Sequence, residues 1–257
     1  MICLVSLIGD QMPEKLDATN WDDIRARFAV NLCHIYCEVK NKATGRTAFN
    51  FGNFQLADGS LSPYYFDFRT IYAYPKYLEE IAEMMIKCVE YNILGFDRSE
   101  LKSNPSPIQR IAGIPNASLG LATLVSVKLN IPSLYCHMKE FYYNEPKYAI
   151  QGSLERGDHV LVIDDLTTTA LRKTETIDII EKNGGQVSHS VVIIDRQEGA
   201  EEKLRERGIG LLSLLKTSEF ATIARNENLI DEKQKERIIA HIRDRRAKDG
   251  LSGINLK

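Results

Sequence analysis

An apolar run from His159 to Ile163 is the feature that most constrains the fold of this 257-residue chain. Continuous β-branched and aliphatic residues, without polar alternation, are typical of a strand buried on both faces of a parallel sheet. Two adjacent carboxylates, Asp164 and Asp165, follow the run directly, and a threonine-rich turn precedes the next helix. Because ligands of such sheets bind beyond the carboxyl ends of the strands, we expect a ligand site here.

The rest of the chain alternates between predicted strands and helices. Strands are predicted at 110–115, 131–136, 159–163, 187–194 and 209–215. Helices are predicted at 21–39, from Pro75 to about 89, at 117–130 and at 171–183, where Gly184-Gly185 follows as a stop signal. Strands separated by helices of about 10–15 residues imply βαβ units. The predicted fold class is therefore α/β, a parallel sheet flanked by helices.

The ends of the chain depart from this alternation. Residues 1–27 carry little pattern and are predicted to form an amino-terminal extension, with one domain over 28–257. Aromatic residues with glycine and proline at 49–68 predict a β-hairpin that turns near Asp58-Gly59. Residues 140–151 are predicted to form a long loop, and two charged helices are expected over 217–248.

Composition excludes several classes of protein. The 33 basic and 35 acidic residues leave a net charge of −2, which argues against a basic face for nucleic acid. No apolar run approaches the roughly 20 residues of a membrane span, and the short apolar start lacks the features of a secretory signal. Five scattered cysteines suit reduced thiols, so a cytoplasmic location is expected. They are Cys3, Cys33, Cys37, Cys88 and Cys136.

The residues after the apolar run suggest a specific ligand chemistry. Carboxylates that accept hydrogen bonds, such as Asp164 and Asp165, suit the vicinal diol of a ribose. Hydroxyls and backbone N–H groups at a helix N-terminus suit a phosphate. Together they indicate a ribose 5-phosphate. The simpler alternative, helix capping by Asp and Thr, accounts for one of these residues but not for the acidic pair.

Three motifs resemble those of a known family. The strand, acidic pair and threonine turn at 159–170 resemble the phosphoribosyl pyrophosphate (PRPP) motif of type I phosphoribosyltransferases. Residues 51–66, FGNFQLADGSLSPYYF, and 191–199, VVIIDRQEG, are similar to two segments of orotate phosphoribosyltransferases. The resemblance runs from about Leu32 to Arg246 and is strongest to the orotate domain of bifunctional UMP synthases.

The resemblance implies a type I phosphoribosyltransferase fold with a small amino-terminal hairpin hood at about 47–69. It implies transfer of ribose 5-phosphate from PRPP to orotate, in UMP biosynthesis, by a cytoplasmic homodimer. Mg²⁺ is expected as cofactor, without direct ligation by the protein. Lys139 and the acidic pair would be catalytic. The residues implied to bind PRPP are Lys139, Asp164, Asp165, Leu166, Thr167, Thr168, Thr169, Ala170, Leu171 and Arg172; those implied to bind orotate are Tyr65, Phe66, Thr168 and Arg196.

Several of these roles have structural alternatives. Tyr65 and Phe66 alternate on one predicted strand, so at least one of them could be core. Arg196 could be a surface ion-pairing residue, and Lys139 a solvated one. Cys33, His34 and Cys37 lack a second ligand pair at matching spacing, which favours buried helix positions over a metal site.

The sequence also departs from the family at the PRPP site. Met138 stands where an arginine is usual, and Tyr142 and Asn144 where a lysine and often a histidine are usual. Ala170, Leu171 and Arg172 replace small or hydroxyl residues of the phosphate turn, while Ala57 and Asp58 replace lysine and serine near the base. Two alternatives therefore stay open: a weak or inactive homologue that binds PRPP or a nucleotide as a regulator, and a phosphoribosyltransferase for another base.

Overall fold

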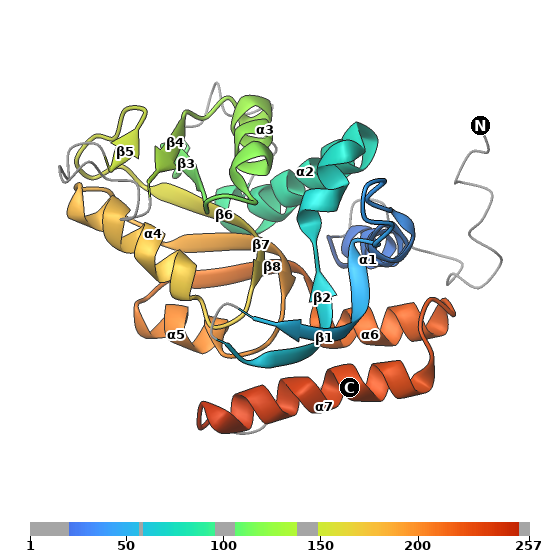
Figure 1. Ribbon diagram of the computed structural model, residues 1–257. Helices are drawn as coiled ribbons and strands as arrows, with labels where there is room; N and C mark the ends of the chain where they lie inside the picture. Colours follow the sequence, from blue (N-terminus) through green and yellow to red (C-terminus); the bar gives the residue numbers. More distant parts are fainter. Residues whose placement is uncertain (1–20, 57–58, 96–105, 138–148, 252–257) are drawn as a thin grey trace.

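A six-stranded sheet forms the centre of the molecule (Figure 1). The computed structural model describes residues 21–56, 59–95, 106–137 and 149–251. The strand order is β5-β4-β3-β6-β7-β8, and all neighbours are parallel except β5, which runs antiparallel to β4. The strands are β3 (Arg110–Gly113), β4 (Ser133–Cys136), β5 (Ile150–Gln151), β6 (Val160–Thr167), β7 (His189–Asp195) and β8 (Gly210–Lys216). The predicted fold class is confirmed.

Strand β6 lies at the centre of the sheet and is buried on both faces. Val160 and Val162 pack into a cluster with α4 (Leu171–Lys182) and α5 (Ala200–Glu206), whereas Leu161 and Ile163 pack into the cluster on the opposite face. Side chains alternate across a strand, so an uninterrupted apolar run supplies both layers at once. The prediction of a strand that is buried on both faces is thus confirmed.

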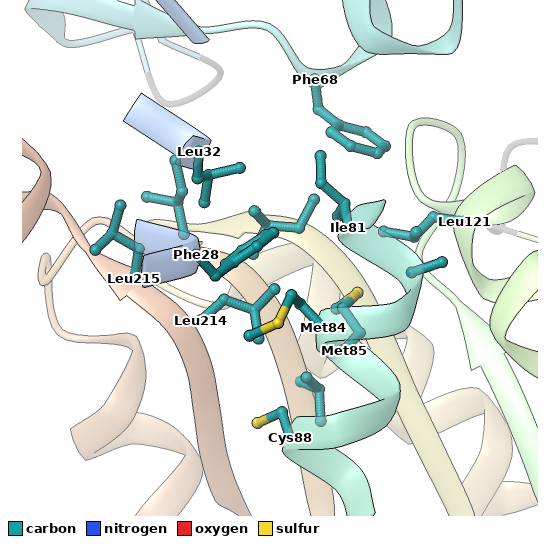
Figure 2. Packing of buried hydrophobic residues seen from close by; sticks show 14 of the residues in the cluster. Phe28, Leu32, Phe68, Ile81, Met84, Met85, Cys88, Leu121, Leu214 and Leu215 are labelled. Carbon is teal, nitrogen blue, oxygen red and sulfur yellow. The ribbon is translucent and has the colours of Figure 1, made fainter. Parts of the chain in front are cut away.

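The second face is covered by α1 (Trp21–Glu38), α2 (Pro75–Val89) and α3 (Leu119–Leu129). Pro75 occupies the first helical position of α2, where its missing N–H costs nothing. Met84, Met85 and Cys88 of α2 lie close to Phe28 of α1 and Leu214 of β8 (Figure 2). This packing ties the amino-terminal helix to the far edge of the sheet.

A two-stranded antiparallel hairpin, β1 (Phe49–Gln55) and β2 (Leu61–Phe66), forms the hood. Phe49 and Phe66 are directly opposite in the register, and both rings lie within 5.0 Å of the ring of Phe220 in α6 (Thr217–Asn226), centroid to centroid. Helix α7 (Glu232–Lys248) follows α6 and also contacts β2. The hood is therefore held by aromatic packing onto the carboxy-terminal helices.

Most elements match their predictions, and the differences are local. Helix α1 begins at Trp21 and runs through residue 28, where the domain was expected to start. The predicted strand at 159–163 extends to Thr167. The sequence analysis missed β5, α5, the 3₁₀ helix η2 (Phe68–Ala73) and the π-helical turn η3 (Glu90–Leu94), all too short to show a period. No helix in the described ranges is long and apolar enough to span a membrane.

Candidate functional site

The acidic pair lies at the carboxyl end of β6, but its two members have different surroundings. Asp164 is buried: its Oδ1 accepts hydrogen bonds from the Ser118 hydroxyl at 2.5 Å and from the Asp165 backbone N–H at 2.9 Å. Its Oδ2 forms an ion pair with Lys173. Asp165 is partly exposed, and its Oδ1 accepts a hydrogen bond from the Leu166 N–H at 2.9 Å. Burial, and then the charge of Asp164, raise the pKa of Asp165 well above its usual range.

The threonine turn connects this strand to α4. Thr167 is the last residue of β6; it is buried, and its hydroxyl has no hydrogen-bond partner among the described residues. Thr168 and Thr169 are partly exposed, and Ala170 takes the left-handed conformation with φ of 62°. The first N–H groups of α4 have no partner within the helix, as at any helix start. Hydroxyls and N–H donors therefore converge at one point, as a phosphate requires.

The last residues of the predicted phosphate turn point to solvent. Leu171 is 66% exposed, and Arg172 is exposed, with its Nη1 3.2 Å from Glu175 Oε2. Their role in holding the 5′-phosphate stays a prediction.

The side chains of the hood residues Tyr65 and Phe66 lie on opposite faces of β2, because side chains alternate along a strand. Phe66 belongs to the core and contacts the rings of Tyr36, Phe49 and Phe220. Tyr65 faces the other way, is partly exposed, and accepts a hydrogen bond on Oη from Arg69 Nη2 at 3.0 Å. Of the two hood residues expected near the base, only Tyr65 is accessible to a ligand.

Arg196 is almost wholly buried in the loop after β7. Its Nη2 donates to the Ser62 hydroxyl at 3.0 Å, its Nε lies 2.8 Å from Glu198 Oε1, and its Cζ lies 4.5 Å from the centre of the Tyr64 ring. Its backbone N–H donates to the carbonyl of Thr167 at 3.0 Å. The structure thus joins the Arg196 loop to the threonine turn, and the surface alternative for Arg196 is wrong.

Glu198 is the fully buried centre of this cluster. A second arginine, Arg245 of α7, approaches its Oε2 at 3.3 Å, and His241 Nε2 lies 3.7 Å from Oε1. Burial and the neighbouring arginines lower the pKa of His241 to about 4, so the imidazole is neutral at pH 7. Two guanidinium groups therefore share one carboxylate, beneath the hood.

Other predicted site residues fall outside the described ranges. These are Lys139, Met138, Tyr142, Asn144, Ala57 and Asp58. The ends of the segment that carries Lys139 are fixed, because His137 N–H donates to the carbonyl of Ala149 at 2.8 Å beside the β4–β5 pair. Cys33 is buried and Cys37 partly buried in α1, as the structural interpretation of these residues predicts.

Two residues of the site were missed by the sequence analysis. Lys173 and Ser118 both bind Asp164, one from α4 and one from the start of α3. Lys173 stands on an otherwise ordinary amphipathic helix, and Ser118 is 46 residues from its partner, so no local pattern identified either of them. Within the described residues no group of three or more His, Cys, Asp or Glu side chains is placed to hold a metal ion.

Comparison with known proteins identifies the family. The phosphoribosyl transferase domain model matches residues 68–208. An orotate phosphoribosyltransferase of Caenorhabditis elegans is 31% identical over 194 residues, 76% of this chain and 80% of that protein. The chain belongs to the orotate phosphoribosyltransferase family.

The orotate phosphoribosyltransferase of Sulfurisphaera tokodaii is 32% identical over 187 residues, 73% of this chain and 88% of that protein. Bovine uridine 5′-monophosphate synthase is 32% identical over 197 residues, but the chain spans only 38% of its length. Among solved structures, Leishmania donovani UMP synthase gives a TM-score of 0.69 at 27% identity, covering 87% of this chain and 44% of that one. The resemblance seen in the sequence is confirmed.

Replacing Glu198 with alanine would remove the carboxylate that pairs with the guanidinium of Arg196 in a buried site. We expect Glu198→Ala to destabilise the fold by about 3–5 kcal/mol, the range for removing one partner of a buried ion pair. Urea denaturation monitored by circular dichroism measures the change. Glu201→Ala is the matched control, because this exposed glutamate has only a distant lysine partner at 3.9 Å and should cost about 1 kcal/mol or less. Equal losses in the two variants would contradict the buried arrangement.

Proposed function

We propose that this chain transfers ribose 5-phosphate from PRPP to N1 of orotate, forming orotidine 5′-phosphate and pyrophosphate in UMP biosynthesis. The observation that carries the proposal is the arrangement at the strand ends. An acidic pair with one buried and one partly exposed carboxylate, a hydroxyl-rich turn at a helix N-terminus and the Arg196 loop meet there. Family membership supports the reaction class, and this arrangement is what we would expect of sites for a diol, a phosphate and an anionic base.

Each group would act by position and charge. The acidic pair would hold the ribose hydroxyls, and the turn from Thr167 would hold the 5′-phosphate through hydroxyl and N–H donors. Such binding fixes the sugar while the bond to pyrophosphate breaks, which is the larger part of catalysis in a transfer with an oxocarbenium-like transition state. Lys139 would approach the departing pyrophosphate.

The base would lie between the hood and the loop after β7. Tyr65 offers its ring, and Thr168 offers a hydroxyl at the start of the turn. Arg196 would meet the orotate carboxylate, a pairing that suits a planar guanidinium. Its Nε and Nη2 already face Glu198 and Ser62 and the residue is 1% exposed, so this pairing stays a prediction.

Mg²⁺ would reach the site on the substrate. The carboxylates at the strand end are Asp164, which is paired with Lys173, and Asp165, which has no cationic partner within 4 Å among the described residues. A site with so little free carboxylate suits an ion held by the oxygens of PRPP, without direct ligation by the protein. The ion would supply positive charge to the pyrophosphate.

We also infer a cytoplasmic location and a homodimer. Cys33, Cys37, Cys88 and Cys136 form no disulfide, which suits a reducing compartment. For the dimer, α3 presents a face that bears no charged residue. The face consists of Gly120, Thr123, Val127 and Asn130 at helical spacing, and Val127 is 71% exposed. An uncharged helix face of this kind suits burial against a second copy of the chain.

Purified protein mixed with orotate, PRPP and Mg²⁺ should deplete the orotate absorbance band. Asp165→Asn should slow the reaction by about 10²-fold or more, because it removes charge and an acceptor at the ribose. Asp178→Asn is the matched control: this aspartate lies on the outer face of α4, in a surface ion pair with Arg207, and its loss should leave the rate unchanged. Absence of turnover by wild-type protein would favour the alternative of a regulatory homologue. Turnover of a different base would favour the alternative of a phosphoribosyltransferase for another base.

Arg196→Ala should weaken orotate binding by about 1.5–3 kcal/mol, the range for hydrogen bonds to charged groups. Calorimetry on variants that retain the wild-type circular dichroism spectrum measures the loss. Arg243→Ala, an exposed arginine of α7, should not change the affinity. An unaltered orotate affinity in Arg196→Ala would remove this residue from the base site.

Val127→Glu should shift the protein from dimer to monomer in light scattering, because a carboxylate would be desolvated at the interface without a partner. Leu61→Glu provides the control, since Leu61 is also exposed, at 66%, but lies on the hood. A wild-type protein that is monomeric at working concentration, or a Val127→Glu variant that remains dimeric, would exclude α3 as the interface.

A further inference from the structure

Lys173 is a buried lysine at the centre of the candidate PRPP site. The residue is 1% exposed, and its ammonium contacts only two groups among the described residues: the Asp164 Oδ2 and the Leu166 carbonyl, at 3.2 Å. Transfer of an ammonium from water into a protein interior is costly unless a charge and hydrogen bonds compensate it. Within the part of the chain that the structure describes, the Asp164 carboxylate is the only negative group that does so.

The same contacts use most of the acceptor capacity of Asp164. An ionised carboxylate has about four lone-pair directions. Three donors already occupy Asp164: Ser118 Oγ, the Asp165 N–H and the Lys173 ammonium. The carboxylate is also buried, with its side chain 10% exposed. Little of it remains for the two hydroxyls of a ribose.

Asp165 differs from Asp164 in both exposure and ion pairing. It is the more exposed of the pair, and no lysine or arginine forms an ion pair with it among the described residues. The charged and titratable groups that act on it are Asp164 and Lys173 beside it, Arg69 and Tyr72 from η2, and Tyr36 from α1. Arg69 is itself held by Asp67, with Nε 2.7 Å from Oδ1.

We propose that Lys173 is a positioning residue: its ammonium fixes Asp164 in the interior of the site, so that Asp165 alone of the acidic pair receives the ribose hydroxyls. The inference rests on the proposed function, in which the acidic pair holds the ribose hydroxyls. It divides that role: Asp164 is held in place, and Asp165 binds the hydroxyls. Lys173 neutralises the inner carboxylate, so the outer one carries the charge of the pair toward the ligand.

Removing the ammonium should therefore change the acidic pair in a definite direction. In Lys173→Met the stem remains, but two neighbouring carboxylates lose their counter-ion in a buried site. Like charges disfavour simultaneous ionisation, so the pair would keep a proton to higher pH. Lys173 lowers the pKa of Asp165, and its loss should raise that pKa further. PRPP binding should then weaken at about pH 6, by about tenfold for each pH unit that the pKa rises, and recover at alkaline pH.

A double variant separates positioning from direct contact. Lys173→Met with Asp164→Asn removes both charges together and keeps an amide acceptor for Ser118 and the Asp165 N–H. We expect calorimetry to give a PRPP affinity within about threefold of wild type. The weakening of PRPP binding at about pH 6 that is expected for Lys173→Met should be absent from this double variant. Asp165→Asn alone should reduce the affinity by about 10²-fold or more. Lys182→Met, an exposed lysine in the last turn of the same helix, should behave as wild type.

The outcomes distinguish this inference from the proposed function. If wild-type protein binds PRPP but the double variant binds it as weakly as Asp165→Asn, Asp164 contacts the ribose and the inference is overturned. If Lys173→Met leaves the pH profile of binding unchanged, the lysine is merely structural and the inference also fails. Failure of wild-type protein to bind PRPP would instead refute the proposed function. Carboxyl NMR of the ligand-free protein then still measures whether Lys173→Met raises the pKa of Asp165.

Discussion

The buried ion pair between Lys173 and Asp164 is the interaction on which the site depends. Strand β6 enters the middle of the sheet as an apolar run and ends in a carboxylate that the interior covers. A buried, unpaired carboxylate would be strongly disfavoured. The ammonium from α4 and the hydroxyl of Ser118 compensate it. These two contacts fix the start of α3 and the first turn of α4 against the end of β6, and so set the walls of the candidate site.

On the other side of the site, too, a buried carboxylate is compensated by cationic side chains, but here two guanidinium groups approach one carboxylate. Glu198 is fully buried and lies between Arg196 and Arg245. Through Ser62 and Tyr64 the cluster reaches the hood, and through Arg245 it reaches α7. The carboxy-terminal helix therefore contributes to the cluster around Glu198, although it contains none of the residues of the three motifs.

Sequence reasoning succeeded where a pattern is local. The apolar run, the Pro75 helix start and the strand alternation of Tyr65 and Phe66 are each decided by neighbouring residues. It did not find Lys173, because nothing adjacent in the sequence distinguishes a lysine that turns inward from one that remains in water. Ser118 was missed for the related reason that its partner, Asp164, lies 46 residues away along the chain. Elements of only a few residues, such as β5, are decided by pairing and not by periodicity.

The charges on the two sides of the candidate site suit the two substrates of the proposed reaction. On the base side two guanidinium groups face one carboxylate, with His241 neutral at pH 7. This arginine-rich side suits the anionic base of the proposed reaction. On the sugar side two carboxylates face one ammonium, which leaves one negative charge for neutral hydroxyls and for a cation carried by the pyrophosphate. The two sides therefore differ in charge, and an anionic base and a sugar that donates hydroxyls are the ligands that would suit them.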